Sequence, residues 1–464
     1  MNDMPRRITL HEWDARYVAL RDAGMTEPAY GGPLRRHVLN GDRRLLSLRF
    51  DNSAAALRLW NFLLTEEDRL HAARAGGKKI VGAMKDLGTV PVMAYSLPEL
   101  VTFYPDGAWW LPCIMEFGTG LLEIADRLGA GDSFCPVRAM LGAFAGQAHF
   151  PIPDLLISSV GATCDDFSAI AQRLTDLGHP ILWWEMPHRR APEPGEAAVV
   201  LPGGTKAAAA QVAVVRAGLE QVRLALESCA GRRLEDAALS AGIRAANRIR
   251  CVLNALREAV YGATVCPLPA LEMQVAEMLA LHFCSDRDEC LLVLEALLTE
   301  ARERVARGVG VMPADAVRVF WVNPVADLRA MNLVEDCGAA ICGTDYLFYH
   351  ALERIPEELP PMEALARTAL ADSMAGAAGE RAARIVREMQ RFNGEALVVS
   401  RIPGASHCAT EGARIREAVD RQLGRLSVEI EVSPVCDAGD AVLRSRLDAL
   451  VEVARQNKSH GKIS

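Results

Sequence analysis

Several features are missing from this 464-residue sequence, and each absence excludes a class of protein. No two cysteines are spaced as CxxC, which excludes zinc ribbons, thioredoxin-like motifs and ferredoxin-type runs. No apolar run reaches the roughly 18–20 residues that a membrane helix needs. The sequence has no Lys/Arg-rich run interleaved with aromatic residues, and its net charge of −8 argues against nucleic-acid binding. It has neither GxxxxGK[ST] nor GxGxxG after a strand, so ATP or NAD binding by this chain is unsupported.

The cysteine content indicates where a metal site would have to come from. Arg6 and Arg7 are followed by Ile8–Asp14, which is not an apolar signal region, so we expect a cytoplasmic protein. In that compartment the twelve cysteines stay reduced, most of them as small buried residues and a minority as metal ligands. Because CxxC is absent, a cluster has to collect its ligands from distant parts of the chain.

The first half of the chain is predicted to hold a helical segment and an α/β lobe. Residues 1–77 mix helical patterns with turns, and Ser53–Ala75 is the clearest helix. In residues 78–204 short strands alternate with helices, which predicts a parallel, doubly wound sheet. The expected strands are Val90–Tyr95, Leu155–Val160 and Pro180–Glu185, and the expected helices are Leu97–Phe103, Gly120–Leu128 and Cys164–Leu177. Arg189–Gly204, rich in Pro, Gly and charge, is interpreted as a linker.

The second half is predicted to hold a helical region and a second α/β lobe. Residues 205–310 are almost wholly helical by periodicity, and packing is the expected role of their cysteines, which are Cys229, Cys251, Cys266, Cys284 and Cys290. In residues 311–464 the expected strands are Val317–Val322, Ala339–Cys342, Ala396–Ile402 and Leu426–Val432, and the expected helices are Asp327–Cys337, Cys408–Leu423 and Ala441–Gln456. We therefore predict an α/β fold with two doubly wound parallel-sheet lobes, a helical insert and an N-terminal helical segment.

A thiol at a helix start, after a strand and a glycine turn, occurs once in each lobe. These two thiols belong to Cys164 and Cys408, and a third, that of Cys135, directly precedes Pro136 and a helical run. A helix N-terminus lowers the pKa of a thiol and favours the thiolate, which is the form that ligates metals. The three thiols either converge on one cleft or are three separate core cysteines. If they converge, three thiolates and an open position suit an iron–sulfur cluster whose fourth site takes substrate or water.

Three stretches of the sequence resemble a known superfamily. They are CPVRAMLGAF, ATCDDFSAI and the C-terminal run RIPGASHCATEG…VSPVCDAGDAVLRSRLDALVEV. They are similar to the large subunits of 2-hydroxyacyl-CoA dehydratases, whose superfamily also includes benzoyl-CoA reductase subunits and double-cubane cluster proteins. The likeness keeps the same order over roughly Lys78–Arg455, although the helical middle matches only in type.

This resemblance implies a cofactor, a ligand set and partners. In the family, a thiol before Pro and a helix, a Thr-Cys-Asp turn and a His-Cys turn supply three ligands of a 4Fe–4S cluster. The matching residues here are Cys135, Cys164 and Cys408. Family members receive an electron from a separate ATP-hydrolysing iron–sulfur activator and commonly work as pairs of homologous subunits. The resemblance therefore implies such an activator, a second subunit that is homologous or identical, and an acyl-CoA or other small-molecule substrate.

Three polar residues are further site candidates. Ser96 and Glu99 lie where the family places polar groups near the cluster or the substrate. A carboxylate in such a low-dielectric site can have a raised pKa and move protons; alternatively, Glu99 lies in the first turn of a helix and complements its dipole. His407 either hydrogen-bonds a cluster sulfur, acts as an acid or caps the turn before Cys408.

The early turn of this chain departs from the family pattern. Family members commonly have a Cys before a Pro-x-Glu-Leu-like helix start, and this sequence has Met93-Ala94-Tyr95 there. Because double-cubane members need more thiol ligands, the departure favours a single cubane. Further candidate thiols for a second cubane are those of Cys113, Cys337 and Cys342.

The resemblance supports one leading hypothesis and two alternatives. The first is an iron–sulfur lyase subunit that dehydrates or reduces an acyl-CoA thioester by radical chemistry, after ATP-driven electron transfer from the activator. The second is an ATP-dependent low-potential reductase of another small substrate, benzoyl-CoA reductase-like or double-cubane-like. The third is a non-catalytic subunit that relays electrons or completes a heterodimer. An open-site cluster would make the protein oxygen-sensitive, so we expect an anaerobic setting.

Overall fold

The computed structural model describes most of the chain. The described residues are 4–25, 31–39, 42–84, 87–105, 107, 120–282, 285–346, 352–434 and 440–459, with the backbone alone for residues 280–282, 406–409 and 440. In the part of the chain that it describes, no helix is both long and apolar enough to cross a membrane.

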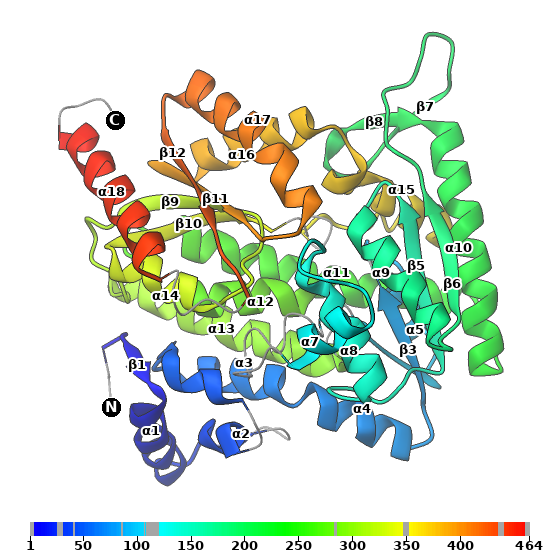
Figure 1. The fold of residues 1–464 in the computed structure, drawn as a ribbon, viewed down its shortest axis with the longest axis horizontal. Coiled ribbons are helices and arrows are strands. Elements are labelled where there is room, and N and C mark those ends of the chain that lie inside the picture. The colour runs from blue at the N-terminus through cyan, green and yellow to red at the C-terminus, as the bar shows by residue number, and fades with distance from the viewer. Residues whose placement is uncertain are drawn as a thin grey trace.

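Two four-stranded parallel sheets with the same strand order carry the two lobes (Figure 1). The first sheet has the order β4-β3-β5-β6 and consists of β3 (Lys79–Met84), β4 (Leu100–Phe103), β5 (Leu155–Gly161) and β6 (Ile181–Met186). The second has the order β10-β9-β11-β12 and consists of β9 (Val317–Val322), β10 (Ala339–Asp345), β11 (Ala396–Arg401) and β12 (Leu426–Glu431). The predicted two-lobe α/β fold is confirmed.

In each sheet the chain winds in both directions from its two middle strands. The connection from the first to the second strand carries α5 (Val90–Tyr95) in one lobe and α14 (Arg329–Asp336) in the other. The connection from the third to the fourth strand carries α9 (Asp165–Asp176) in the first lobe and α17 (Ser406–Leu423) in the second. Each of these helices packs on the face of its sheet opposite to the one that α5 or α14 covers. This reversal leaves a crevice at the carboxyl ends of the two middle strands, where open α/β sheets bind their ligands.

Both faces of each sheet are covered by helices, so the strands are buried on both sides. In β9, Phe320 and Val322 pack against α16 (Ala378–Arg391) and α17, whereas Val319 and Trp321 share the opposite core with α14 and α18 (Asp440–Ser459). In the first lobe, one face is covered by α7 (Gly120–Arg127), α8 (Ala139–Gly146) and α9. Parallel strands buried in this way are near-continuous apolar runs, which explains why the pattern revealed most of them.

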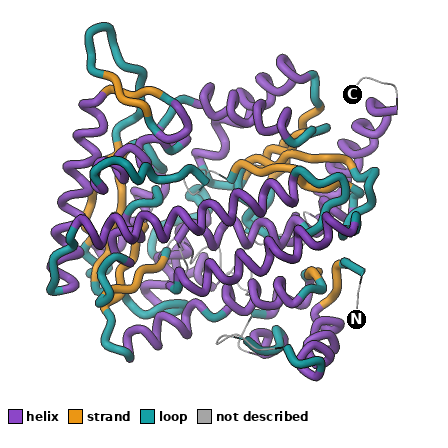
Figure 2. The backbone as a smooth tube through the Cα atoms, turned by 180° about the vertical axis from the view of Figure 1, so that it is seen from behind, coloured by secondary structure: helices purple, strands orange, loops and turns teal. Residues whose placement is uncertain are grey.

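The helical region joins the two lobes from behind. It consists of α10 (Ala209–Ala230), α11 (Asp236–Tyr261), α12 (Ala270–His282) and α13 (Arg287–Arg307). Of these, α11 and α13 run side by side across the back of the molecule (Figure 2). From α11, Arg250 Nη2 donates to Gly88 O at 3.4 Å in the first lobe, and Arg257 Nη1 donates to Thr344 Oγ1 at 2.7 Å in the second. The same helix therefore holds the loop after β3 and the end of β10, at the carboxyl edges of the two sheets. The predicted helices of residues 205–310 are confirmed, except that Lys206–Ala208 is strand β8.

The N-terminal segment contains a small sheet as well as helices. Its elements are β1 (Arg7–Thr9), α1 (Leu10–Asp22), α2 (Arg35–Leu39), η1 (Arg43–Ser47), β2 (Arg49–Asp51), α3 (Ala54–Leu64) and α4 (Glu66–Ala75). The antiparallel β1–β2 pair was not predicted, because its strands are only three residues long and 39 residues apart in sequence. The division of the chain at residues 77, 204 and 310 stays a prediction, since one apolar core runs through all four parts.

Three sequence predictions were wrong. Val90–Tyr95, expected as a strand, is helix α5, which begins with Pro91 in its first turn. Leu97–Phe103, expected as a helix, contains strand β4. The expected linker Arg189–Gly204 contains strand β7 (Ala198–Val200), which pairs with β8. The first two elements are short and buried except for the half-buried Tyr95, so neither a period of 2 nor one of 3.6 appears in their sequence.

A buried carboxylate cluster docks the N-terminal segment onto the helical region. Arg304 of α13 binds Asp51 with both terminal nitrogens, at 2.5 and 2.9 Å. Beside this pair, Glu272 Oε1 accepts hydrogen bonds from Trp60 Nε1 and from the Asp51 backbone, each at 3.0 Å. Burial, reinforced by the nearby negative charge of Asp51, raises the pKa of Glu272 to about 8. Glu272 therefore holds a proton in the folded protein at neutral pH.

This proton makes the stability of the protein depend on pH. Because the folded-state pKa of Glu272 lies above the ordinary value of 4.5, its contribution is complete below pH 4.5 and is lost as the pH rises through about 8. We expect Glu272→Gln to reduce the fall in unfolding free energy over this interval, by up to about 1.4 kcal/mol per pH unit. Urea unfolding at several pH values measures the slope. The exposed Glu303→Gln on α13 is the control, and equal slopes in both variants and the wild type would contradict the assignment.

Candidate functional site

Cys164 and Cys408 follow equivalent strands in the two lobes. Cys164 is the N-cap residue of α9, which follows β5, and Cys408 is the third residue of α17, which follows β11. Both strands are the third in chain order in their lobe and both lie beside the first. A glycine with positive φ ends β5, Gly161 at 103°, and another follows β11, Gly404 at 78°. Both cysteines therefore lie at the crevice between the middle strands, as their shared sequence pattern indicates.

Cys135 belongs to the first lobe but packs against the second. It directly precedes η3 (Pro136–Arg138) and contacts an apolar cluster formed by Ala326, Ile402 and Ala405 of the second lobe. A Cβ on Gly404 would overlap the backbone of Phe134, the residue before Cys135, so the close approach of these two loops requires glycine.

The same two loops bring the helix starts together. Cys135 and Cys164 are half-buried and pack against the same apolar cluster of the first lobe, and α9 contacts both η3 and α17. The structure thus gathers Cys135, Cys164 and the first turn of α17 where the lobes meet.

The side chains of His407 and Cys408 lie outside the described part of the structure. The distances between the three thiols are therefore not among the described contacts. Among the described side chains, no three His, Cys, Asp or Glu residues gather as they would around a metal ion. The backbone does place Cys408 two residues further into the helix than predicted, because α17 begins at Ser406. Cys135 and Cys164 fit thiolate ligands, because both are partly exposed cysteines at helix starts. The three-cysteine ligand set that includes Cys408 stays a prediction.

The remaining described cysteines lie elsewhere. Cys337 ends α14 and Cys342 lies inside β10, and burial raises the pKa of each thiol to about 12, which favours the neutral form. Cys266 and Cys290 are buried in the helical region, Cys229 is half-buried and Cys251 is exposed. Packing is confirmed for the buried pair and does not describe Cys251. Three cysteines lie outside the described residues: Cys113, Cys284 and Cys436.

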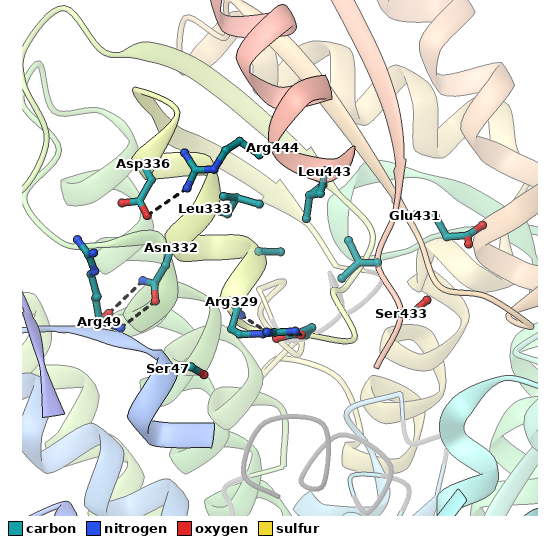
Figure 3. Close-up of a pocket in the computed structure, with 13 residues that line it drawn as sticks. Ser47, Arg49, Arg329, Asn332, Leu333, Asp336, Glu431, Ser433, Leu443 and Arg444 are labelled. Carbon is teal, nitrogen blue, oxygen red and sulfur yellow. Dashed lines mark hydrogen bonds and ion pairs between the residues drawn. The ribbon is translucent and has the colours of Figure 1, made fainter. Parts of the chain in front are cut away.

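A cavity of about 280 Å³ lies on the second-lobe side of this junction (Figure 3). Its walls are the length of α14, the end of β12, the start of α18 and the segment from Ser47 to Arg49 of the N-terminal part. At one end it reaches Asp327, the residue after Ala326, which contacts the cluster that includes Cys135. The cavity therefore adjoins the place where the lobes meet.

Residues 103–454 match the family described as "2-hydroxyglutaryl-CoA dehydratase, D-component". The match covers more than half of the chain and all three cysteines, Cys135, Cys164 and Cys408. The chain belongs to this family. As a member of the D-component family, it is a dehydratase-type enzyme subunit of the kind that the resemblance predicts. A search of curated proteins gives no match to this chain.

Two of the predicted site residues of this D-component family member lie away from the cysteines. Glu99 directly precedes β4, and its carbonyl accepts from Lys79 N at the start of β3, so it lies at the amino edge of the parallel sheet. Cys164 lies beyond the carboxyl edge of the same sheet. Glu99 is also not in the first turn of a helix; its Oε1 lies 3.3 Å from Arg232 Nη1. Ser96 ends α5 and donates to Val92 O at 2.7 Å.

The sequence interpretation missed a buried arginine that ties α17 to the sheet. Arg381 of α16 is only 1% exposed, and its guanidinium lies 2.6 Å from Glu411 Oε2, which is one helical turn after Cys408. It also donates to Asn323 Oδ1 at 2.7 Å and lies 3.4 Å from Asp345 Oδ1. Asn323 follows β9 with φ of 70° and donates through Nδ2 to Ser400 O of β11 at 2.9 Å. One signal was available, because Asn-Pro directly after an apolar strand marks a turn at the sheet edge.

Removing this guanidinium should loosen the start of α17. We expect Arg381→Met to lower the unfolding free energy by about 3 kcal/mol, because it leaves buried carboxylates with fewer partners. We also expect the amide hydrogens around residues 404–411 to exchange faster, because their tie to the sheet edge is lost.

Arg384→Met is the matched control, since Arg384 binds the other oxygen of Asp345 at 2.6 Å. Hydrogen exchange read by mass spectrometry measures the effect in both variants. Equal exchange at residues 404–411 in the two variants would show that Arg381 does not hold the helix start.

Proposed function

We propose that this chain is the subunit of a 2-hydroxyacyl-CoA dehydratase that holds a 4Fe–4S cluster through Cys135, Cys164 and Cys408. The observation that carries the proposal is the meeting of η3, α9 and the start of α17 at the junction of the lobes, each with one of these cysteines at its beginning. Family membership supplies the reaction class. When bound, such a cluster supplies one-electron chemistry at an iron with an open position.

The residues of this chain would prepare the site for that chemistry. The helix starts of α9 and α17 present backbone N–H groups and the positive ends of their dipoles, which favour thiolates. The apolar contacts of Cys135 with Ala326, Ile402 and Ala405 keep water away from one side of the site. In a site with little water, electrostatic interactions with a bound thioester are stronger than in solution. His407, directly before Cys408, is the remaining candidate for a proton donor among the three polar residues predicted from the sequence.

Ser96 and Glu99 are left out of the proposed site. They lie at the end of α5 and directly before β4, at the amino edge of the first sheet, whereas the cysteines lie at carboxyl edges. The electron is proposed to come from a separate ATP-dependent activator and the second half of the enzyme from a homologous or identical subunit. The double-cubane alternative is less well supported, since the neutral thiols of Cys337 and Cys342 are buried in the second lobe.

The cluster proposal is tested by metal analysis of protein purified without oxygen. We expect about four irons and as many acid-labile sulfides per chain, with most of the iron lost in Cys135→Ala, Cys164→Ala and Cys408→Ala. The exposed Cys251→Ala, in the middle of α11, is the matched control and should keep its iron.

Three outcomes would contradict the proposal. Iron that is retained in any of the three variants would remove that residue from the ligand set. Absence of iron in the wild type, even after anaerobic reconstitution, would leave the structural or relay subunit as the remaining hypothesis. About eight irons per chain would instead revive the double-cubane alternative.

A further inference from the structure

The wall of the cavity between α14 and α18 contains Arg49, which forms no ion pair with a described carboxylate. Arg49 is exposed, and in the described part of the chain its guanidinium has no hydrogen bond or ion pair. Its backbone is held firmly: Arg49 N donates to Asn332 Oδ1 at 2.8 Å, and Asn332 Nδ2 donates to Arg49 O at 3.0 Å. The backbone of Arg49 is therefore fixed at the cavity wall, and its guanidinium is available to a ligand.

A second arginine at the same end is only weakly paired. Arg444 of α18 is 48% exposed and lies 3.9 Å from Asp336 Oδ2, at the limit of an ion pair. The other oxygen of Asp336 is already bound by Arg7 at 2.9 Å. Figure 3 shows Arg49 and Arg444 on the same side of the cavity as Asp336, while Glu431 points away from them. The guanidinium groups of Arg49 and Arg444 therefore face this end of the cavity. The carboxylate there, that of Asp336, is already bound by Arg7.

The opposite end also carries more positive than negative charge. There, Arg329 Nη2 lies 2.5 Å and Arg44 Nη1 3.5 Å from the same oxygen of Asp327. The cavity is lined by three arginines and three carboxyl groups, those of Asp327, Asp336 and Glu431. Arg44 and Arg7, which lie outside the lining, also pair with Asp327 and Asp336.

We propose that this cavity binds an anionic group, a carboxylate or a phosphate, of the thioester substrate through Arg49 and Arg444. Guanidinium groups bind both anions through paired, charge-assisted hydrogen bonds. The volume of about 280 Å³ lies just below the range for small-molecule sites, so it suits one charged part of a ligand rather than a whole acyl-CoA. The identification of the ligand as a thioester rests on the proposed function. The anion site rests on the cavity and on the positions of Arg49 and Arg444 in its wall.

The position of the cavity suits this role. Asp327 at its near end follows Ala326, which packs in one cluster with Cys135. The cavity extends from there along α14 toward the N-terminal segment, so a ligand in it would run from the junction of the lobes to Arg49. An anion fixed at Arg49 would then orient the other end of the same molecule toward the three cysteines.

The test is titration calorimetry of the full chain with four probes: free CoA, pantetheine, glutarate and inorganic phosphate. Arg49→Gln should weaken binding of the charged probes about tenfold or more, because it removes a charge-assisted contact. Arg43→Gln is the matched control, since Arg43 is an exposed arginine of the neighbouring η1 that does not line the cavity. It should bind within twofold of the wild type. Arg444→Gln should weaken the same probes as Arg49→Gln.

The four probes distinguish the two sources of the anion. A dependence on Arg49 that is seen with CoA and phosphate, and not with glutarate, would assign the cavity to the phosphates of the cofactor. The reverse pattern would assign it to a carboxylate at the end of the acyl chain. Wild-type protein that binds none of the charged probes, or Arg49→Gln that binds them as the wild type does, would overturn the proposal. Iron content is measured on the same samples, so Arg49-dependent binding in protein without iron would retain the anion site and reject the cluster.

Discussion

The contact between Gly404 and the backbone of Phe134 is the constraint on which the candidate site depends. Gly404 lies in the loop from β11 into α17, and Phe134 lies directly before Cys135, so this contact joins the two lobes at their carboxyl edges. The loops approach so closely that a Cβ would collide with a carbonyl group. A larger residue would separate the start of α17 from Cys135. The positive φ of Gly404 makes the same demand on the backbone.

The two lobes share more than a strand order. In each, the connection from the second to the third strand contains a 3-10 turn followed by a helix: η3 and α8 in the first lobe, η7 (Ser373–Ala375) and α16 in the second. Met374 of η7 packs against the same small cluster that Cys135 contacts from η3. The lobes therefore meet through equivalent elements, η3 and η7. The side chains that these elements place at the junction differ. One lobe contributes a cysteine where the other contributes a methionine.

The helical region gives this junction its rigidity. Because α11 binds the loop after β3 through Arg250 and the end of β10 through Arg257, the two carboxyl edges are held by one continuous element. Arg381 adds a second tie within the second lobe, between the sheet edge and α17. Both arginines of α11 are buried, as is Arg381, so their geometry depends on well-made polar contacts rather than on apolar packing alone. Buried polar contacts thus hold both carboxyl edges to α11 and the start of α17 to its sheet.

The sequence by itself determined the strands that are followed by a glycine and a thiol, and most of the helices around them. The apolar run of β5 and the periodicity of α9 and α17 are local properties, because backbone dihedral angles set periods that a short window can reveal. It did not determine α5 or β4, whose short buried segments carry no period. Only the tertiary structure decided which residues meet: Gly404 against Phe134, Arg381 against Glu411, and Arg49 against Asn332, which is 283 positions away. These contacts depend on how two sheets pack through space, and no local pattern encodes the distance between residues so far apart.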